Sequence, residues 1–121
     1  MKKILFIFIW TTLLIFVGGK NNFVYAYDSV TFVNATGRTI YYVYFVPNHY
    51  ENWGSDRLIG VWNSGNSLTL DSSYWRYWAL KIVFEGGEYA FWSGNNPIDA
   101  QTVWKGTIVP NGNGNYTLIH N

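Results

Sequence analysis

Apolar and polar residues alternate with a period of two along most of the chain from residue 28 onward. This is the period of a half-buried β-strand, whereas an amphipathic helix repeats about every 3.6 residues. Each connector between the alternating segments contains glycine, asparagine, proline or serine, which turns require. The pattern therefore predicts no helix in this part of the chain and eight strands, at 28–34, 38–46, 57–62, 67–71, 75–85, 88–92, 102–109 and 115–120.

Eight short strands predict an all-β fold, either an antiparallel β-sandwich or a small barrel. In the segment 75–85, four apolar residues fall on one face and are expected in the core: Trp78, Leu80, Ile82 and Phe84. The segment 38–46 is apolar on both faces. It is therefore either a central strand or a strand whose outer face carries an aromatic patch.

The first 26 residues have a different character. They consist of MKK, an apolar run from Ile4 to Val17, and a segment ending in Val24-Tyr25-Ala26. These are the three parts of a secretory signal peptide, so we predict an N-terminal signal helix within residues 1–26 and a single domain at 27–121. The alternative is a retained membrane anchor. Fourteen helical residues span only about 21 Å of a roughly 30 Å apolar bilayer core, which favours the cleaved signal.

Removal of this leader changes the charge of the chain. Residues 27–121 carry five basic and seven acidic residues, a net charge of −2, against +1 for the whole sequence. A small negative charge without a basic stripe argues against nucleic acid and against anionic membrane surfaces as partners. The chain also contains no cysteine, so its core must hold it together. We expect an exported bacterial protein, either periplasmic or extracellular.

The stretch HYENWGSDRLIG at 49–60 mixes charged, amide and aromatic residues, which makes it a candidate metal site. Residues 27–121 contain only two histidines, His49 and His120, which is too few for a histidine-based zinc site in a chain without cysteine. The segment 48–56 offers two carboxylates without the spacing of an EF-hand calcium loop. We therefore predict no metal and no cofactor.

The same stretch is then expected to be a structural turn with an exposed tip. Trp53 should pack inward, Gly54 should permit the bend, and Asp56 should cap the turn through its side-chain oxygen. The tip would consist of three residues that come before Trp53 in the stretch: His49, Tyr50 and Glu51.

Catalytic chemistry is not apparent in the sequence. No serine lies in a G-x-S-x-G context, and no glycine-rich phosphate loop precedes a helix. Glu85 and Glu88 flank a Gly-Gly hairpin, where acidic residues usually serve solubility. We therefore predict that the protein is not an enzyme.

Aromatic residues make up 21% of the chain, and several lie beside asparagine, glutamine or glycine. Sugar-binding modules use this combination to stack on pyranose rings and to bond their hydroxyls. The candidate ligand-binding residues are Trp75, Tyr77, Trp92 and Trp104. We predict a non-catalytic binding module for a carbohydrate or an envelope protein. The alternative is a structural or protein-interaction module of the cell envelope, in which most of these rings are core.

Three segments together resemble a class of small, mostly uncharacterised exported bacterial domains: VNATGRTIYYVYFVP (33–47), NWGSDRLIG (52–60) and ALKIVFEGGEYAFWSGNN (79–96). The shared pattern is N-x-T-G-x-T-I, then W-G-x-D-x-L, then G-G-x-x-x-x-W. Its positions here are Asn34, Thr36, Gly37, Thr39, Ile40, Pro47, Trp53, Gly54, Asp56, Leu58, Gly87 and Trp92.

This resemblance implies a compact β-sandwich and no assigned activity. Gly86 stands where the class commonly has aspartate, which weakens any idea of an acidic cluster at that hairpin. In the first motif we expect Gly37 to adopt a positive φ in a hairpin between the first two strands, with Asn34 and Thr36 bonding the turn backbone.

Overall fold

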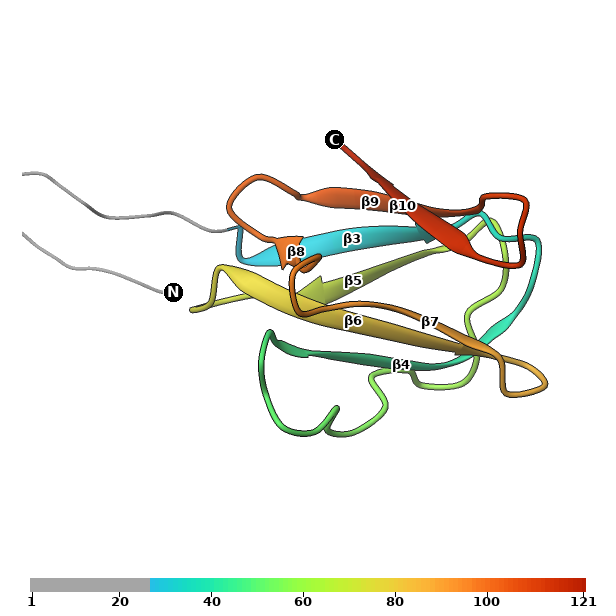
Figure 1. The fold of residues 1–121 in the computed structure, drawn as a ribbon, viewed down its shortest axis with the longest axis horizontal. Helices are drawn as coiled ribbons and strands as arrows, with labels where there is room; N and C mark the ends of the chain where they lie inside the picture. The colour runs from blue at the N-terminus through green and yellow to red at the C-terminus, as the bar shows by residue number, and fades with distance from the viewer. Residues whose placement is uncertain (1–26) are drawn as a thin grey trace, which may run out of the picture.

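The computed structural model describes residues 27–121, so the signal peptide expected at 1–26 lies outside the described residues. Residues 27–121 form eight strands in two sheets and no helix, and therefore no helix that could cross a membrane (Figure 1). The strands are β3 (Ser29–Asn34), β4 (Ile40–Pro47), β5 (Ser67–Asp71), β6 (Tyr77–Phe84), β7 (Tyr89–Trp92), β8 (Ile98–Asp99), β9 (Lys105–Pro110) and β10 (Tyr116–His120).

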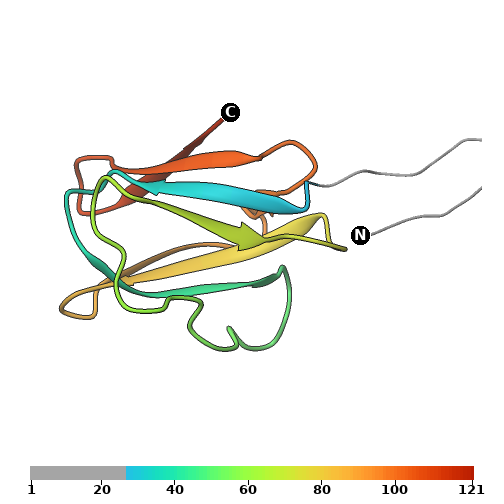
Figure 2. The same cartoon turned by 180° about the vertical axis from the view of Figure 1, so that it is seen from behind.

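The two sheets lie one above the other, as both opposite views show (Figures 1 and 2). One sheet has the strand order β10-β9-β3-β5, and the other has the order β4-β6-β7, with β8 also paired to β6. All pairs are antiparallel except β3 with β9, which are parallel. The prediction of an all-β chain of eight strands is confirmed, and the parallel pair is a departure from the fully antiparallel expectation.

The core lies between the sheets and is built on aromatic contacts across them. Phe32 of β3 meets Phe45 of β4 edge to face, with ring centres 5.8 Å apart at 75°. Phe45 in turn stacks on Trp78 of β6 at 4.7 Å and 11°. The apolar face predicted for 75–85 is confirmed as core, because each of its residues is at most 5% exposed: Trp78, Leu80, Ile82 and Phe84.

The strand predicted at 57–62 is wrong. Only Trp62 makes a bridge in this segment, to Ile40 at the start of β4. The preceding residues follow the free edge of β4 with side-chain bonds and one backbone bond from Arg57, without a continuous ladder. The segment therefore has the composition of a strand without the regular pairing of one. The two-residue strand β8, which was not predicted, raises the number of strands to eight.

Asp56 and Arg57 cover the edge of β4 that faces away from β6. The Val43 N–H donates to Asp56 Oδ1 at 2.9 Å, and the Arg57 N–H donates to the Val43 carbonyl at 2.7 Å. The Arg57 guanidinium also donates to the Phe45 carbonyl at 2.8 Å. Unpaired backbone groups on an edge strand can pair with a strand of another chain. These bonds occupy some of those groups on β4. Asp56 caps its own turn as well, accepting from the Leu58 N–H at 3.0 Å.

The connection at 35–39 is an arch between the two sheets and not the expected hairpin, since β3 and β4 belong to different sheets. Gly37 does adopt the expected positive φ, at 79°. The fully buried Asn34 side chain organises the arch: its Nδ2 donates to the carbonyls of Arg38 and Trp62, both at 2.9 Å. Its Oδ1 accepts from the Thr36 N–H at 3.0 Å and from the Thr36 hydroxyl at 2.6 Å.

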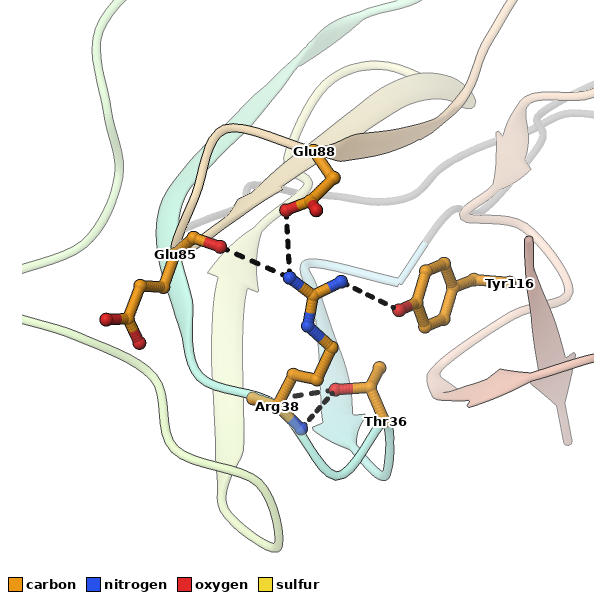
Figure 3. A network of polar contacts seen from close by, with 5 residues as sticks. All are labelled: Thr36, Arg38, Glu85, Glu88 and Tyr116. Atoms are coloured by element: carbon orange, nitrogen blue, oxygen red, sulfur yellow. Dashed lines mark hydrogen bonds and ion pairs between the residues drawn. The ribbon is translucent and has the colours of Figure 1, made fainter. Parts of the chain in front are cut away.

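The Arg38 side chain ties this arch to both sheets (Figure 3). Its guanidinium donates to the Tyr116 hydroxyl of β10 at 3.3 Å, to the Glu85 carbonyl at 3.2 Å and to Glu88 Oε1 at 2.9 Å. It also lies 4.5 Å from the centre of the Phe84 ring. The hydrogen bond from Arg38 lowers the pKa of Glu88, and the bonds to Tyr116 and Glu88 raise the pKa of Arg38. The β6–β7 turn is thereby held in place.

Stability is expected to fall in acid because three carboxyl groups have a lowered pKa in the folded chain. Arg38 bonds Glu88, Arg76 bonds Asp99, and the Ser73 hydroxyl bonds Asp71. A lowered folded pKa contributes stability above the unfolded value, near pH 4, and loses it as the pH falls through the folded value. Urea midpoints measured at pH 7, 5 and 3 should drop mainly between pH 5 and 3.

The control for this pH dependence is Asp99→Asn, which removes one of the three titrating groups. The variant should show a smaller fall in midpoint between pH 5 and 3 than the unmodified chain. Equal midpoints at pH 7 and pH 3 in the unmodified chain would contradict the expectation.

Candidate functional site

The outer face of the β4-β6-β7 sheet, turned away from the core, carries aromatic side chains around a single lysine. The cross-strand register places Tyr44 and Phe91 on either side of Lys81. Tyr42 and Tyr89 flank the next outward position of β6, and Tyr89 lies 6.1 Å from Phe91 at 24°. We call this surface the aromatic face, and it consists of Tyr42, Tyr44, Trp53, Lys81, Tyr89 and Phe91.

Trp53 joins this surface from the loop that follows β4. Its ring lies 6.5 Å from that of Phe91, and the Lys81 ammonium lies 5.9 Å from the Trp53 ring centre. Trp53 is therefore half-buried on the outside of the sheet, and the expectation that it packs into the core is wrong. The reason is that the loop folds back over the sheet, where Gly54 lies beside Val46: a Cβ at Gly54 would be in van der Waals contact with Val46 Cγ1, at 3.5 Å.

Beside the aromatic face, between the loop and the sheet, lies a hollow of about 250 Å³. The sheet contributes Val46 and Ala79, which point outward yet are only 9% and 4% exposed because the loop covers them. Tyr50 and Trp53 contribute aromatic walls. Amide, carboxylate, imidazole and hydroxyl groups complete the lining, from Asn48, His49, Glu51, Asn52 and Ser93.

Hydrogen bonds fix the loop in this position. Asn48 Nδ2 donates to the Gly94 carbonyl at 2.9 Å, and the Gly94 N–H donates back to Asn48 Oδ1 at 3.0 Å. This reciprocal pair joins the loop to the connection between β7 and β8. His49 has a φ of 72°, in the left-handed region that non-glycine residues seldom adopt. The loop that covers the hollow is therefore held at one end by the two bonds between Asn48 and Gly94. At its other end it is held by the bonds of Asp56 and Arg57 to β4.

The predicted loop tip, His49, Tyr50 and Glu51, is exposed and lines the hollow. Tyr50 also meets Trp75 edge to face at 6.4 Å. This contact brings one of the predicted ligand-binding residues next to the tip. Tyr77, a second one, lies on the same outer face of β6 and is 45% exposed, with the Arg76 guanidinium 4.7 Å from its ring centre.

The other two predicted ligand-binding residues do not join this surface. Trp92 is only 7% exposed, because it pairs in register with Leu80 and so points into the core. Its expected role on a binding surface is therefore corrected to core packing. Trp104 is 48% exposed, but it lies just before β9 of the other sheet, beside Ser29 and Thr31 of β3.

None of the six residues of the aromatic face was predicted as a ligand-binding residue. Trp53 was expected only as part of the turn, and the other five were not singled out for binding: Tyr42, Tyr44, Lys81, Tyr89 and Phe91. A signal for them exists in the sequence, since Tyr42 with Tyr44 and Tyr89 with Phe91 are each two positions apart in a strand. Such pairs share one face. The second reading of the segment 38–46, a strand with an outer aromatic patch, is the one that the structure supports, because β4 lies at an edge of its sheet.

The aromatic face and the hollow present aromatic, amide and charged groups. Within residues 27–121, no group of three or more histidine, aspartate or glutamate side chains is placed to hold a metal ion. The aromatic face offers ring surfaces for stacking, and the hollow offers amide and carboxylate groups for hydrogen bonds. Lys81 adds one positive charge.

Comparison with known proteins gives one informative likeness. No family model matches the chain, and no curated protein matches it. An NMR structure of a protein from Eubacterium rectale superposes with a TM-score of 0.56 at 12% sequence identity, covering 84% of this chain and 94% of that one. At this identity the likeness concerns the fold alone, and the resemblance to exported bacterial domains stays a prediction.

Proposed function

We propose that this protein is an exported, non-catalytic β-sandwich that binds carbohydrate through the aromatic face and the adjacent hollow. The observation that carries the proposal is the side-by-side exposure of rigid rings on one sheet, next to a hollow with polar walls. Tyr42, Tyr89 and Phe91 are 47%, 58% and 54% exposed. Single exposed apolar residues are ordinary on protein surfaces, but a contiguous patch marks a binding surface.

A pyranose ring suits this combination of groups. Its C–H faces pack on aromatic rings, and its hydroxyls bond to amides and carboxylates at the edge of the contact. Trp53 stands between the two parts, since it contacts Phe91 and also lines the hollow. The composition of residues 1–26 supports export.

A second candidate function is a protein-interaction module of the cell envelope. It is favoured by the part of the aromatic face formed by Tyr89 and Phe91, which lies outside the hollow. Tyrosine and phenylalanine are enriched at the centres of protein interfaces. A dimer that forms with concentration, and that Phe91→Ala abolishes, would favour this candidate over carbohydrate.

Trp53→Ala tests the carbohydrate function. Isothermal titration of residues 27–121 with soluble oligomers of glucose, N-acetylglucosamine and galacturonic acid should show binding to at least one series. The variant should bind that series about fivefold or more weakly, because a lost stacking contact is worth on the order of 1 kcal/mol or more. Trp104→Ala, at a 48% exposed tryptophan next to the other sheet, is the control and should bind unchanged. Absence of binding to all three series, or equal losses in both variants, would overturn the proposal.

A further inference from the structure

We infer that the saccharide bound by the aromatic face is acidic and that the Lys81 ammonium binds its anionic group. This inference rests on the proposed carbohydrate function and names the chemical class of its ligand. It comes from the position of Lys81 among the rings, from the lack of an acidic partner for it, and from the charges that surround it.

The first step is the position of Lys81. Lys81 of β6 lies between Tyr44 and Phe91 in the cross-strand register, at the middle of the aromatic face. Its ammonium lies 4.7 Å from the ring centre of Tyr89 and 5.9 Å from that of Trp53. The side chain is half-buried. A ring that stacks on these aromatic side chains therefore brings its substituents close to this charge.

The second step is the missing partner. Among residues 27–121 the ion pairs join Arg38 to Glu88 at 2.9 Å and Arg76 to Asp99 at 3.0 Å, and Lys81 belongs to neither. Aromatic rings attract a cation through their negative faces, but they leave its full positive charge uncompensated. Attraction between opposite charges is stronger where rings exclude water. An anionic group on the ligand would complete this arrangement.

The third step concerns the acidic residues on the same side of the molecule. Glu88, next to Tyr89, is already neutralised by Arg38. Glu51 lines the hollow, to which Lys81 does not contribute, and is exposed. The net charge of −2 repels anions at long range, so recognition of an acidic ligand depends on contact with Lys81 and not on steering.

The experiment compares pairs of ligands in which one member carries an anionic group that is masked or missing in the other. Residues 27–121 are titrated calorimetrically with trigalacturonic acid and with its neutral methyl ester, and in a second arm with glucose 6-phosphate and with glucose. At least one acidic ligand should bind about tenfold or more tightly than its neutral partner. The arm with the larger ratio shows whether the anionic group is a carboxylate or a phosphate. Raising the salt from 50 to 500 mM should reduce the ratio.

Two variants assign the effect to Lys81. Lys81→Gln should abolish the preference for the acidic member while still binding the neutral one, and Lys81→Arg should retain the preference. Thermal melts confirm that both variants fold. Equal affinity for acidic and neutral members, or a preference that survives in Lys81→Gln, would overturn the inference and leave the carbohydrate function standing. Absence of binding to either arm and to the neutral series above would remove both.

Discussion

Replacing Asn34 by aspartate is expected to lower the free energy of unfolding by about 4 kcal/mol. The Asn34 side chain is fully buried, and both hydrogens of its amide are used, toward the carbonyls of Arg38 and Trp62. Aspartate has the same shape but no amide hydrogens. The carboxylate would keep the two bonds from Thr36, but it would face the two carbonyls without amide hydrogens to donate. It must therefore either stay charged without a counter-ion or take up a proton.

Urea unfolding followed by tryptophan fluorescence measures this loss. Asn63→Asp is the matched control, because Asn63 is exposed and uses its side-chain oxygen as the acceptor for the Thr39 hydroxyl. Aspartate keeps that acceptor, so the control should stay within about 0.5 kcal/mol of the unmodified chain. A similar small change for Asn34→Asp would show that the arch does not depend on the amide.

Phe45→Ala is expected to cost about 4 kcal/mol, because the change leaves a cavity at the centre of the core. Phe45 is fully buried and contacts one aromatic ring from each sheet, Phe32 and Trp78. The same strand, β4, offers the control Tyr42→Ala, at a position that is 47% exposed on the outer face.

The two alanine variants are compared by their urea midpoints and slopes. Phe45→Ala should shift the midpoint strongly, whereas Tyr42→Ala should lower the free energy of unfolding by less than about 1 kcal/mol. Equal effects of the two variants would mean that the inner and outer faces of β4 are assigned incorrectly. The comparison also shows whether an aromatic residue of the proposed binding surface can be removed without unfolding the chain.

The strands could be predicted because their signal is local. Alternation in 75–85 places Leu80 and Ile82 inward, and both are fully buried. The Gly86-Gly87 turn was recognisable for the same reason, since two adjacent glycines with φ near 97° and 96° close the hairpin of β6 and β7. Such features depend only on neighbours in the chain.

The remaining features depend on partners that are distant in the sequence. β3 runs parallel to β9, and no residue of either strand indicates that choice. The segment 57–62 looks like a strand because it alternates, but Asp56 and Arg57 satisfy the edge of β4 in place of a ladder. Sequence patterning also could not show that Trp53 lies outside the sheet, since an aromatic residue in a loop can pack on either side.

Only part of the candidate site could be predicted, because the rest also depends on partners that are distant in the sequence. The tip residues His49, Tyr50 and Glu51 could be selected because a long polar loop after an apolar strand is exposed. The prediction relied on tryptophans as the exposed rings, but Trp92 lies in the core. The exposed rings of the aromatic face are mostly those of tyrosines and Phe91. Deciding between these roles requires knowing which side of each strand faces the other sheet.

The loop after β4 is fastened at both ends, by Asn48 to Gly94 and by Asp56 and Arg57 to β4. The residues between these anchors contribute little to the core. Related sequences could therefore diversify 49–53 while keeping the anchors, and so change what the hollow accepts without altering the sheets. The loop residues would then set the ligand specificity, while the two sheets stay the same. The loop is for this reason also a practical place to graft new binding residues.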